Sequence, residues 1–314
     1  TEMGYLAHVV AMEEISRASA SIGLSYGAHS NLCVNQIYLN GNEEQKAKYL
    51  PGLVEGSIVF SESISERGAA SSLKTLKATG RRSGGDWIIN GQKIWTSRAA
   101  QSDLMLLLAR TTPRDQVAKR TDGLSVFILD MREALQAGLT IRPIRTMMNH
   151  ATTEVFFDNV RVPAANLVGE EGKGFRYILS GMNAERILIA SECIGDGRFF
   201  IDRASAYAKD RNVFGRAIGE NQGVQFPIAR AYVQLSAAAE MVTKAARMFD
   251  AGETAGTEAN MAKMLASEAS WFAADMCIQT HGGFGFAEEY DVERKFRETR
   301  LYQVAPISTN LILS

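Results

Sequence analysis

The first fifty residues have the spacing of apolar positions that is typical of amphipathic helices. In the opening stretch, Leu6, Val9, Met12 and Ile15 recur every three or four residues, with polar and charged residues among them. A second helical pattern, NEEQKAKYL, follows and is expected to end before Pro51, which lacks a backbone donor. We therefore expect an N-terminal helical domain over residues 1–53, truncated at its start because the chain opens inside the first pattern.

The spacing changes at about residue 54. Short runs rich in β-branched and aromatic residues now alternate with turn signals; the runs are SIVFS, GGDWIINGQKIW, DLMLLLAR, GLSVFIL and TEVFFDNVRV. Within the second run, Asn90-Gly91 is a typical hairpin turn. Because no helical pattern separates these strands, residues 54–164 are predicted to form a β domain, an antiparallel sandwich or barrel.

Helical spacing returns after residue 165 and continues to the end of the chain. We expect long helices near residues 173–210, 223–250, 257–280 and 290–303. Pro306, followed by Ser308, Thr309 and Asn310, then stops the last helix. The predicted fold class is therefore α+β, with N-terminal helices, a middle antiparallel β domain and a C-terminal helical bundle over residues 165–314, truncated at its end.

Composition and charge exclude several classes of function. Apolar residues make up 46% of the 314 residues and the net charge is −1, so neither nucleic acid nor an anionic membrane is an expected partner. Cys33, Cys193 and Cys277 form no CxxC pair and the histidines are scattered, so we expect a reducing compartment and no metal site. No membrane-spanning run or signal peptide is present, although a targeting segment could precede this trimmed sequence.

Four stretches together resemble the acyl-CoA dehydrogenase family of flavoenzymes. They are NGQKIWTS, RNVFGRAIGENQ, QTHGGFGF and RETRLYQ, and their order and spacing carry the resemblance, because none is specific alone. The resemblance implies an FAD enzyme that removes two hydrogens across the α,β bond of an acyl-CoA thioester and passes electrons to an electron-transfer flavoprotein. It also implies a homotetramer, or dimer of dimers, in the bacterial cytoplasm or the mitochondrial matrix.

The stretch NGQKIWTS supplies candidate flavin contacts. On the residues alone, an aromatic side chain such as Trp95 on a strand is more often simply part of the core. The resemblance implies instead that Trp95 packs on the flavin, next to Thr96, and that the hydroxyl of Ser97 bonds the isoalloxazine ring.

The stretch RNVFGRAIGENQ has two interpretations. It is either an ordinary helix end followed by a glycine turn or an anion-binding segment, because the planar fork of Arg211 can bond two phosphate oxygens at once. The resemblance implies that Arg211, Phe214 and Gln222 reach the FAD of a neighbouring subunit. The flavin site would then require an oligomer.

The stretch QTHGGFGF follows a helix and is spaced G-G-x-G, so it is not the dinucleotide-binding fingerprint. On its own it is typical of a helix C-cap with a left-handed glycine. The resemblance implies that Gln279, Gly282 and Gly283 lie against the adenosine side of FAD, where the missing Cβ atoms let backbone amides approach phosphate. It also assigns Ser308 and Asn310, in the last loop, to the cofactor.

The stretch SERGAASS departs most from the family pattern, which commonly reads Thr/Ser-Glu-Pro-Gly-Ala-Gly-Ser-Asp. The resemblance implies that the backbone here faces the flavin, through Glu62, Ser63, Ile64, Ser65 and Ser71. It also makes the Ser71 hydroxyl a thioester-binding group. Ala70 stands in place of a glycine, and if that backbone needs a positive φ the alanine costs roughly 1 kcal/mol and weakens flavin binding.

The catalytic base is expected on a helix, because the last loop has no carboxylate. Many family members carry Glu-Gly there, where this chain has Pro306 and Ile307. In the isovaleryl-CoA and long-chain branches the base lies on a helix that reads Glu-Arg, which resembles Glu185-Arg186 in LSGMNAERILIA. The apolar residues that follow Glu185 predict burial and a raised pKa, which suits a base.

On the residues alone, Glu185 could equally be a solvated glutamate or one partner of an ion pair. The resemblance also implies substrate contacts from Ser71, Tyr177, Asn183, Arg186, Pro306 and Ile307.

Two other functions stay open at this point. A flavin monooxygenase on the same fold would need no α-proton base, and a catalytically silent paralogue would keep the fold without the chemistry. Pro306, which has no amide with which to bond the thioester carbonyl, keeps both alternatives open, and the altered SERGAASS loop favours the silent paralogue.

Overall fold

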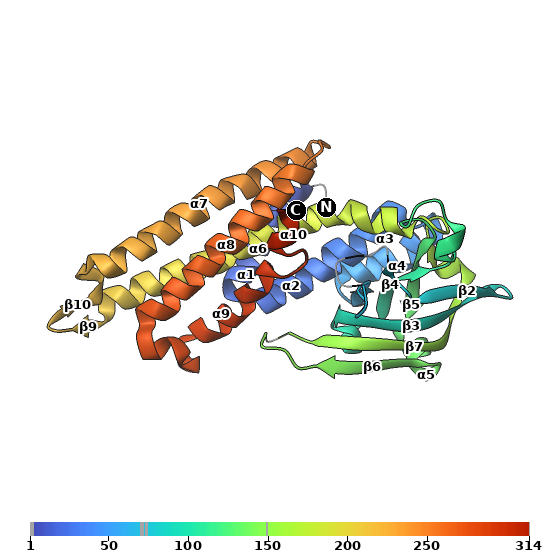
Figure 1. Cartoon of the computed structure of the whole chain (residues 1–314), viewed down its shortest axis with the longest axis horizontal. Coiled ribbons are helices and arrows are strands. Elements are labelled where there is room, and N and C mark those ends of the chain that lie inside the picture. Colours follow the sequence, from blue (N-terminus) through green and yellow to red (C-terminus); the bar gives the residue numbers. More distant parts are fainter. Residues whose placement is uncertain (1–2, 70–71, 73–74, 149, 314) are drawn as a thin grey trace. The chain divides into compact units, whose positions relative to one another are not determined.

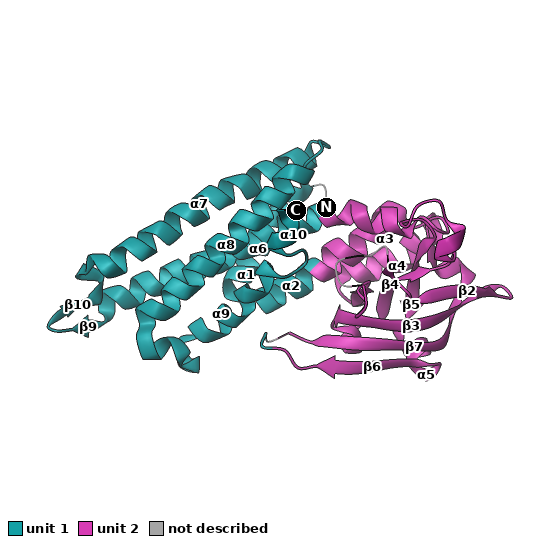
Figure 2. Cartoon of the chain, viewed as in Figure 1, with its two compact units in different colours: residues 1–27, 147–149, 183–314 teal, residues 28–146, 150–182 magenta. Residues whose placement is uncertain are grey.

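The computed structural model describes residues 3–69, 72, 75–148 and 150–313, which belong to two compact units (Figure 2). Unit 1 comprises Thr1–Gly27, Met147–Asn149 and Asn183–Ser314 and is mainly helical. Unit 2 comprises Ala28–Thr146 and His150–Met182 and contains the large β-sheet. Each unit combines segments that are distant in sequence. The division into three domains drawn from the sequence stays a prediction.

Unit 1 is built from long helices (Figure 1). Their bounds are α1 (Gly4–Ala18), α2 (Ala20–Gly27), α6 (Gly174–Asp210), α7 (Gln222–Asp250), α8 (Gly256–His281), α9 (Val292–Arg300) and α10 (Thr309–Ile312). The first residues of α6 belong to unit 2. Between α6 and α7, β9 (Asn212–Val213) and β10 (Arg216–Ala217) form a short antiparallel hairpin. The long C-terminal helices predicted from the apolar spacing are confirmed.

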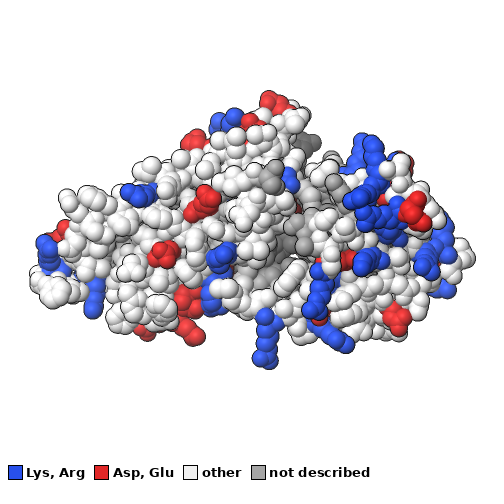
Figure 3. All heavy atoms as spheres, in the orientation of Figure 1, with Lys and Arg blue, Asp and Glu red and all other residues white. Residues whose placement is uncertain are grey.

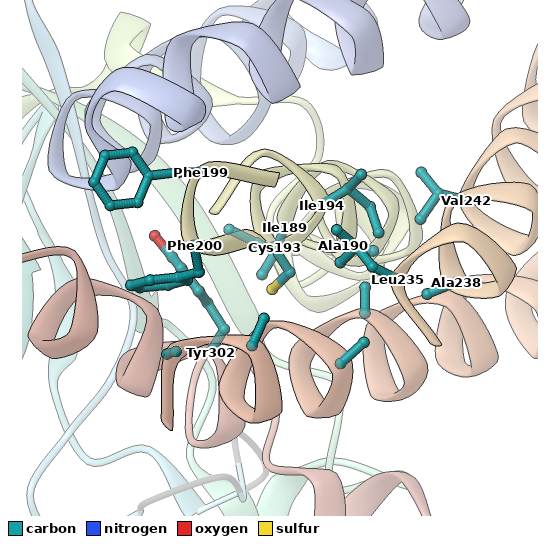
Figure 4. Close-up of a cluster of buried hydrophobic side chains, with 14 of the residues drawn as sticks. Ile189, Ala190, Cys193, Ile194, Phe199, Phe200, Leu235, Ala238, Val242 and Tyr302 are labelled. Carbon is teal, nitrogen blue, oxygen red and sulfur yellow. The ribbon is translucent and has the colours of Figure 1, made fainter. Parts of the chain in front are cut away.

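The core of unit 1 lies among α6, α7, α8 and α9 (Figure 4). On α8 it consists mostly of small side chains: Ala259, Ala262, Ala266, Ala269 and Ala273. Small residues let neighbouring helices approach closely, and Ile194 and Phe200 of α6 and Leu235 of α7 fill the remaining space. No helix in the described ranges is long and apolar enough to cross a membrane.

Unit 2 begins with a π-helical segment, Ala28–Val34, followed by α3 (Asn35–Asn40) and α4 (Glu43–Glu55). Asn42 and Gln45 form a capping box at the start of α4. The expectation that this helix ends before Pro51 is wrong, because it continues to Glu55 and is capped by Gly56, which has a φ of 79°. Pro51 has no backbone N–H to donate within the helix. The helix tolerates this loss because its apolar face is buried in the core of unit 2.

The sheet of unit 2 has the strand order β6-β7-β3-β2-β4-β5-β8, with β1 beside β4. The strands are β1 (Phe60–Ser63), β2 (Thr79–Ser83), β3 (Asp86–Ser97), β4 (Leu104–Arg110), β5 (Leu124–Asp130), β6 (Leu139–Ile144), β7 (Thr152–Pro163) and β8 (Leu167–Val168); α5 (Met131–Gln136) follows β5. Most pairs are antiparallel, as predicted. β1 and β2 also pair with β4 in parallel, which the sequence did not predict.

The predicted hairpin turn at Asn90-Gly91 is also wrong. β3 runs through both residues and pairs with β2 on one side and with β7 on the other. The turn between β2 and β3 lies at Gly84 and Gly85 instead. Gly91 marks an irregularity in the pairing with β7, and a Cβ there would lie 2.7 Å from the backbone of Ala78. The glycine serves a close backbone approach and not a turn.

Candidate active site

The first candidate cluster lies in unit 2, near the end of β3. The register between β3 and β7 shifts between Ile94 and Thr96, so Trp95 is the extra residue of a β-bulge. Trp95 has a φ of 63°, and its side chain is 59% exposed. This left-handed conformation costs a tryptophan roughly 1–2 kcal/mol. The alternative that Trp95 is a core residue is therefore wrong, and its ring is free to stack on a planar ligand.

The segment that follows β1 lies along the same part of β3. The backbone N–H of Ile94 donates to the carbonyl of Ser65 at 3.0 Å, and the buried hydroxyls of Ser63 and Thr96 are 2.9 Å apart. These bonds fix the two strand ends beside Trp95. The structure thus brings together the predicted flavin contacts Glu62, Ser63, Ile64, Ser65, Trp95, Thr96 and Ser97.

A buried ion pair orders this segment. Lys93 Nζ lies 2.9 Å from Glu66 Oε1 and donates to the carbonyl of Ile64 at 2.8 Å. Glu66 also accepts hydrogen bonds from two backbone N–H groups just before β2, at 2.6 and 2.9 Å. Burial lowers the pKa of Lys93 to about 8, against the opposing attraction of Glu66. Lys93 and Glu66 therefore have structural roles, in which each buried charge is paired.

The second cluster lies in unit 1, where α6 ends and α7 begins (Figure 1). Phe214 occupies the turn between β9 and β10 with a φ of 54°, and its side chain is fully exposed. Arg211 directly follows α6, and its guanidinium lies 5.9 Å from the ring centroid of Phe284. Gln222 is the exposed first residue of α7. The stretches RNVFGRAIGENQ and QTHGGFGF, which are distant in sequence, are therefore neighbours.

The stretch QTHGGFGF closes α8, as the C-cap interpretation predicted, but the ψ of Gly282 is −133°, so this glycine is not in the left-handed helical region. The N–H of Gly282 bonds to the carbonyl of Gln279, with a φ of 60° at Gly282. A Cβ placed on Gly282 or Gly283 would meet no atom within 4 Å, so the backbone of both residues faces open space. Gln279 is exposed on the last turn of α8. The arrangement could accept a phosphate or a nucleotide, and this role stays a prediction.

The third cluster surrounds Glu185, near the start of the part of α6 that belongs to unit 1. Glu185 is half-buried, and burial raises the pKa of its carboxyl to about 7, although the positive charge of Arg186 opposes this shift. The guanidinium of Arg186 donates to Asn183 Oδ1 at 2.7 Å. Among the described residues, no ion pair or hydrogen bond engages the carboxylate of Glu185. A carboxylate of this kind can accept a proton near neutral pH.

Tyr5 of α1 lies close to this carboxylate and was not among the predicted site residues. Its hydroxyl donates to the carbonyl of Ala184, and its ring packs against Phe249, with centroids 4.7 Å apart. The pKa of Tyr5 is raised, first by burial and then by the negative charge of Glu185. The sequence contained no signal for this role, because an aromatic residue at a helical core position is ordinary.

Tyr177 lies on the part of α6 that belongs to unit 2. Its hydroxyl accepts the backbone N–H of Glu170 at 2.9 Å, and a Cβ on Gly169 would come within 2.5 Å of its ring. These contacts hold the loop that precedes α6. A substrate contact at Tyr177 stays a prediction, and Ser71 lies outside the described residues.

The last loop, residues 304–308, follows α9 and a short 3-10 turn, Leu301–Gln303. Pro306 is exposed and Ile307 is half-buried. The hydroxyl of Ser308 accepts the backbone N–H of Leu311 at 3.2 Å and so caps α10, in which Asn310 is exposed. The contacts proposed for these four residues with substrate or cofactor stay predictions.

Lys263 of α8 contacts this loop and was also absent from the predicted site. Its Nζ donates to the carbonyl oxygen of Ile307 at 2.6 Å, and its side chain is completely buried. A signal was present in the sequence, because Lys263 is a single cation among the alanines of a helix face. The neighbouring buried residues of α8 include Ala259, Ala262 and Ala266.

Comparisons with known proteins agree with this arrangement. The sequence models of the N-terminal, middle and C-terminal domains of acyl-CoA dehydrogenases match residues 1–57, 61–160 and 172–306. The mitochondrial isovaleryl-CoA dehydrogenase of Oryza sativa is 35% identical over 304 residues, which cover 96% of this chain and 73% of that protein. An acyl-CoA dehydrogenase of Bacillus subtilis is also 35% identical, over 95% of this chain and 78% of that protein.

A solved structure agrees as well. The butyryl-CoA dehydrogenase of Megasphaera elsdenii has a TM-score of 0.93 to this chain at 29% identity, and the match covers 99% of this chain and 80% of that one.

Proposed function

Because this chain belongs to the acyl-CoA dehydrogenase family of FAD-dependent oxidoreductases, we propose that it forms a double bond between Cα and Cβ of an acyl-CoA thioester, with Glu185 as the base. One observation carries the assignment of the base. The carboxyl of Glu185 has a pKa of about 7, in a chain whose last loop contains no carboxylate. Such a group is partly ionised at neutral pH and can take a proton from a weak carbon acid.

The described residues fit an FAD. In unit 2, Trp95 offers an exposed ring, which suits a planar isoalloxazine, and the half-buried Ser97 nearby carries a hydroxyl. In unit 1, Arg211 offers a guanidinium for pyrophosphate oxygens, and no Cβ obstructs the backbone of Gly282. When bound, FAD supplies the acceptor for the hydride that leaves Cβ.

In the proposed reaction Glu185 removes the pro-R α-proton. The electrons of the broken Cα–H bond form the Cα=Cβ double bond as the β-hydrogen leaves with its electron pair, and the proton stays on the carboxyl of Glu185. The raised pKa strengthens the carboxylate as a base. Asn183 holds Arg186 by the 2.7 Å hydrogen bond, so a positive charge stays close to the ionised form of Glu185.

The α-proton becomes acidic only when the thioester carbonyl accepts hydrogen bonds, because negative charge develops on its oxygen. Pro306 occupies the position whose amide would serve this purpose and has no N–H. We assign the task to the next amides, those of Ile307 and Ser308. Among the described residues neither of these N–H groups has a hydrogen-bond acceptor.

We propose an acyl-CoA as the substrate and an electron-transfer flavoprotein as the electron acceptor. In support, unit 2 has more basic than acidic residues, and on the face seen in Figure 3 its Lys and Arg side chains gather, which suits the phosphates of CoA. The expected setting is the bacterial cytoplasm or the mitochondrial matrix, given the mitochondrial plant relative and the Bacillus subtilis relative.

We further propose a homotetramer, or dimer of dimers, in which a neighbouring subunit completes each flavin site. Phe214 is fully exposed, and Phe226, Tyr232 and Val233 of α7 are at least 60% exposed, which is typical of contacts between chains. Arg211→Ala is then expected to lower the ratio of flavin to protein while leaving the helical circular dichroism unchanged. A monomer that retains one FAD per chain would contradict this arrangement.

Anaerobic titration of the purified flavoprotein with a panel of straight and branched acyl-CoAs tests the proposed reaction. We expect at least one acyl-CoA to bleach the flavin absorbance and to yield the 2-enoyl-CoA. In a parallel incubation in air, a hydroxylated product formed with consumption of oxygen would favour the monooxygenase alternative. A protein that no acyl-CoA bleaches would favour the silent paralogue.

A further inference from the structure

Lys263 is a buried cation that the proposed reaction has not yet used. Its side chain is 0% exposed, and no carboxylate forms an ion pair with it in the part of the chain that the structure describes. The other fully buried lysines, Lys93 and Lys295, each bind a carboxylate. An ammonium group without such a partner is costly to bury. Its location therefore points to a role in function.

The one hydrogen bond found for Lys263 reaches the last loop. Its Nζ donates to the carbonyl oxygen of Ile307 at 2.6 Å. Two turns further along α8, Ser270 is hydrogen-bonded to Thr299 of α9, so the same helix also holds the segment that leads into the loop. α8 thus contacts both the loop and the helix that precedes it. Lys263 is the residue of α8 that fixes the position of the loop.

Lys263 also senses the charge of Arg186, the residue that follows the proposed base. The pKa of Lys263 is lowered by burial, and the charge of Arg186 lowers it further, against the attraction of Cys193. Arg186 follows Glu185 directly on α6. The positive charges of Arg186 and Lys263 therefore interact, and Lys263 is the one that contacts the Ile307 carbonyl.

The orientation of one peptide follows from this contact. In a trans peptide the C=O group and the N–H of the next residue point in opposite directions. The peptide between Ile307 and Ser308 is trans, so holding the Ile307 carbonyl toward α8 turns the Ser308 N–H away from α8. That N–H has no acceptor among the described residues and is available to a ligand.

We propose that Lys263 is a positioning residue that orients the Ile307–Ser308 peptide, so that the Ser308 amide donates to the thioester carbonyl in place of the amide that Pro306 lacks. This inference rests on the proposed function, because it names the donor that polarises the thioester during removal of the α-proton. Lys263 acts through the loop and does not itself touch the substrate.

The test measures exchange of the α-protons of a bound 3-thia-acyl-CoA with deuterated water. The sulfur at the β position prevents dehydrogenation, so exchange reports proton removal alone. In Lys263→Met, which keeps the length of the side chain but has no donor, exchange is expected to slow by roughly 10- to 100-fold, because a catalytic group displaced by about 1 Å loses that much rate. The dissociation constant of the analogue and the FAD content should stay close to those of the parent.

Lys244→Met is the matched control, because it makes the same change at an exposed lysine that pairs with Glu258. It should exchange at the parent rate. Lys263→Arg retains a donor and should recover part of the lost rate, which a merely structural effect of the methionine would not predict.

The outcomes separate the two proposals. A folded, FAD-loaded parent that binds the analogue but exchanges no α-proton overturns the proposed function and this inference with it. A parent that exchanges, together with a Lys263→Met variant that exchanges equally fast, overturns the inference alone. If Lys263→Met does not fold, Lys263→Leu, which also has no donor, replaces it; slower exchange in that variant supports the positioning role, and an unchanged rate refutes it.

Discussion

Glu185 and Glu192 lie two turns apart on α6, and burial raises the pKa of both carboxyls, yet their surroundings differ. Glu192 is completely buried and accepts a hydrogen bond from the hydroxyl of Tyr302. The charges of Asp196, Lys295 and Glu298 also act on it. Glu185 is only half-buried.

The comparison teaches that a raised pKa does not by itself identify a catalytic base. The Glu192 carboxyl is enclosed by the packing of unit 1, so no substrate can reach it. Among the described residues, the Glu185 carboxylate has no ion-pair or hydrogen-bond partner, and its side chain remains partly exposed. The two glutamates therefore differ in whether a substrate can reach the carboxyl and in whether its oxygens are free to accept a proton. The predictions below test that difference.

The largest expected effect is that of Glu185→Gln on the rate of flavin reduction. This change removes the proton acceptor but keeps the size of the side chain, so flavin reduction by a good acyl-CoA should slow by roughly 10²–10⁴-fold. Binding of the acyl-CoA should change little. Single-turnover stopped-flow absorbance measures the rate, and Glu192→Gln is the matched control, expected to reduce its flavin at nearly the parent rate. Equal slowing of flavin reduction in both variants would contradict the distinction between Glu185 as the base and Glu192 as a structural residue.

A large loss of stability is expected at Lys295, on α9. Its ammonium group binds Asp196 and the carbonyl of Ser16 in a fully buried setting. Lys295→Met leaves buried carboxylates without their cation, which should lower the free energy of unfolding by about 3–5 kcal/mol. Urea denaturation of the holoenzyme, followed by circular dichroism, measures this loss. The folded fraction should still reduce its flavin at close to the parent rate, and a selective loss of rate would make this network part of the active site.

The smallest expected effect is that of Glu192→Gln on the free energy of unfolding. Burial already favours the neutral acid, and glutamine has the same shape and keeps an acceptor for Tyr302, so the loss near pH 5 should be about 1 kcal/mol or less. The sign of the pH dependence follows from the raised pKa. Above the ordinary value of 4.5 the unfolded chain ionises and the folded chain does not, so this residue destabilises the parent as pH rises.

Glutamine cannot ionise, so the stability of Glu192→Gln should improve relative to the parent between pH 5 and pH 8. Thermal unfolding at several pH values measures the difference. A difference that stays constant with pH would mean that the Glu192 carboxyl is ionised in the folded protein.

Much of the fold could be predicted from the sequence, because apolar spacing is a local signal. The periodicity around α6, α7 and α8 predicted their extents closely, and the apolar residues after Glu185, such as Ile187 and Leu188, indicated the direction of its pKa shift, although the side chain is only half-buried. The resemblance to acyl-CoA dehydrogenases is confirmed by the matches over nearly the whole chain.

Other features could not be predicted, because they depend on contacts between distant segments. Asn90-Gly91 has the local chemistry of a turn, but the approach of Ala78 to Gly91 explains the glycine. The bulge at Trp95 arises from the pairing of β3 with β7. Lys263 stood out in the sequence as a single cation among alanines, but its contact with the last loop depends on the packing of α8.

The most direct test of the central claim is the pH dependence of anaerobic flavin bleaching at a subsaturating concentration of a good acyl-CoA. If Glu185 is the base, its carboxyl must be ionised, and its pKa of about 7 sets the profile. The parent rate should rise about tenfold per pH unit below pH 7 and level off above it, while Glu185→Gln should be slow and independent of pH over that range. A Glu185→Gln variant that bleaches as fast as the parent, or that shows the same ionisation near pH 7, would contradict the assignment.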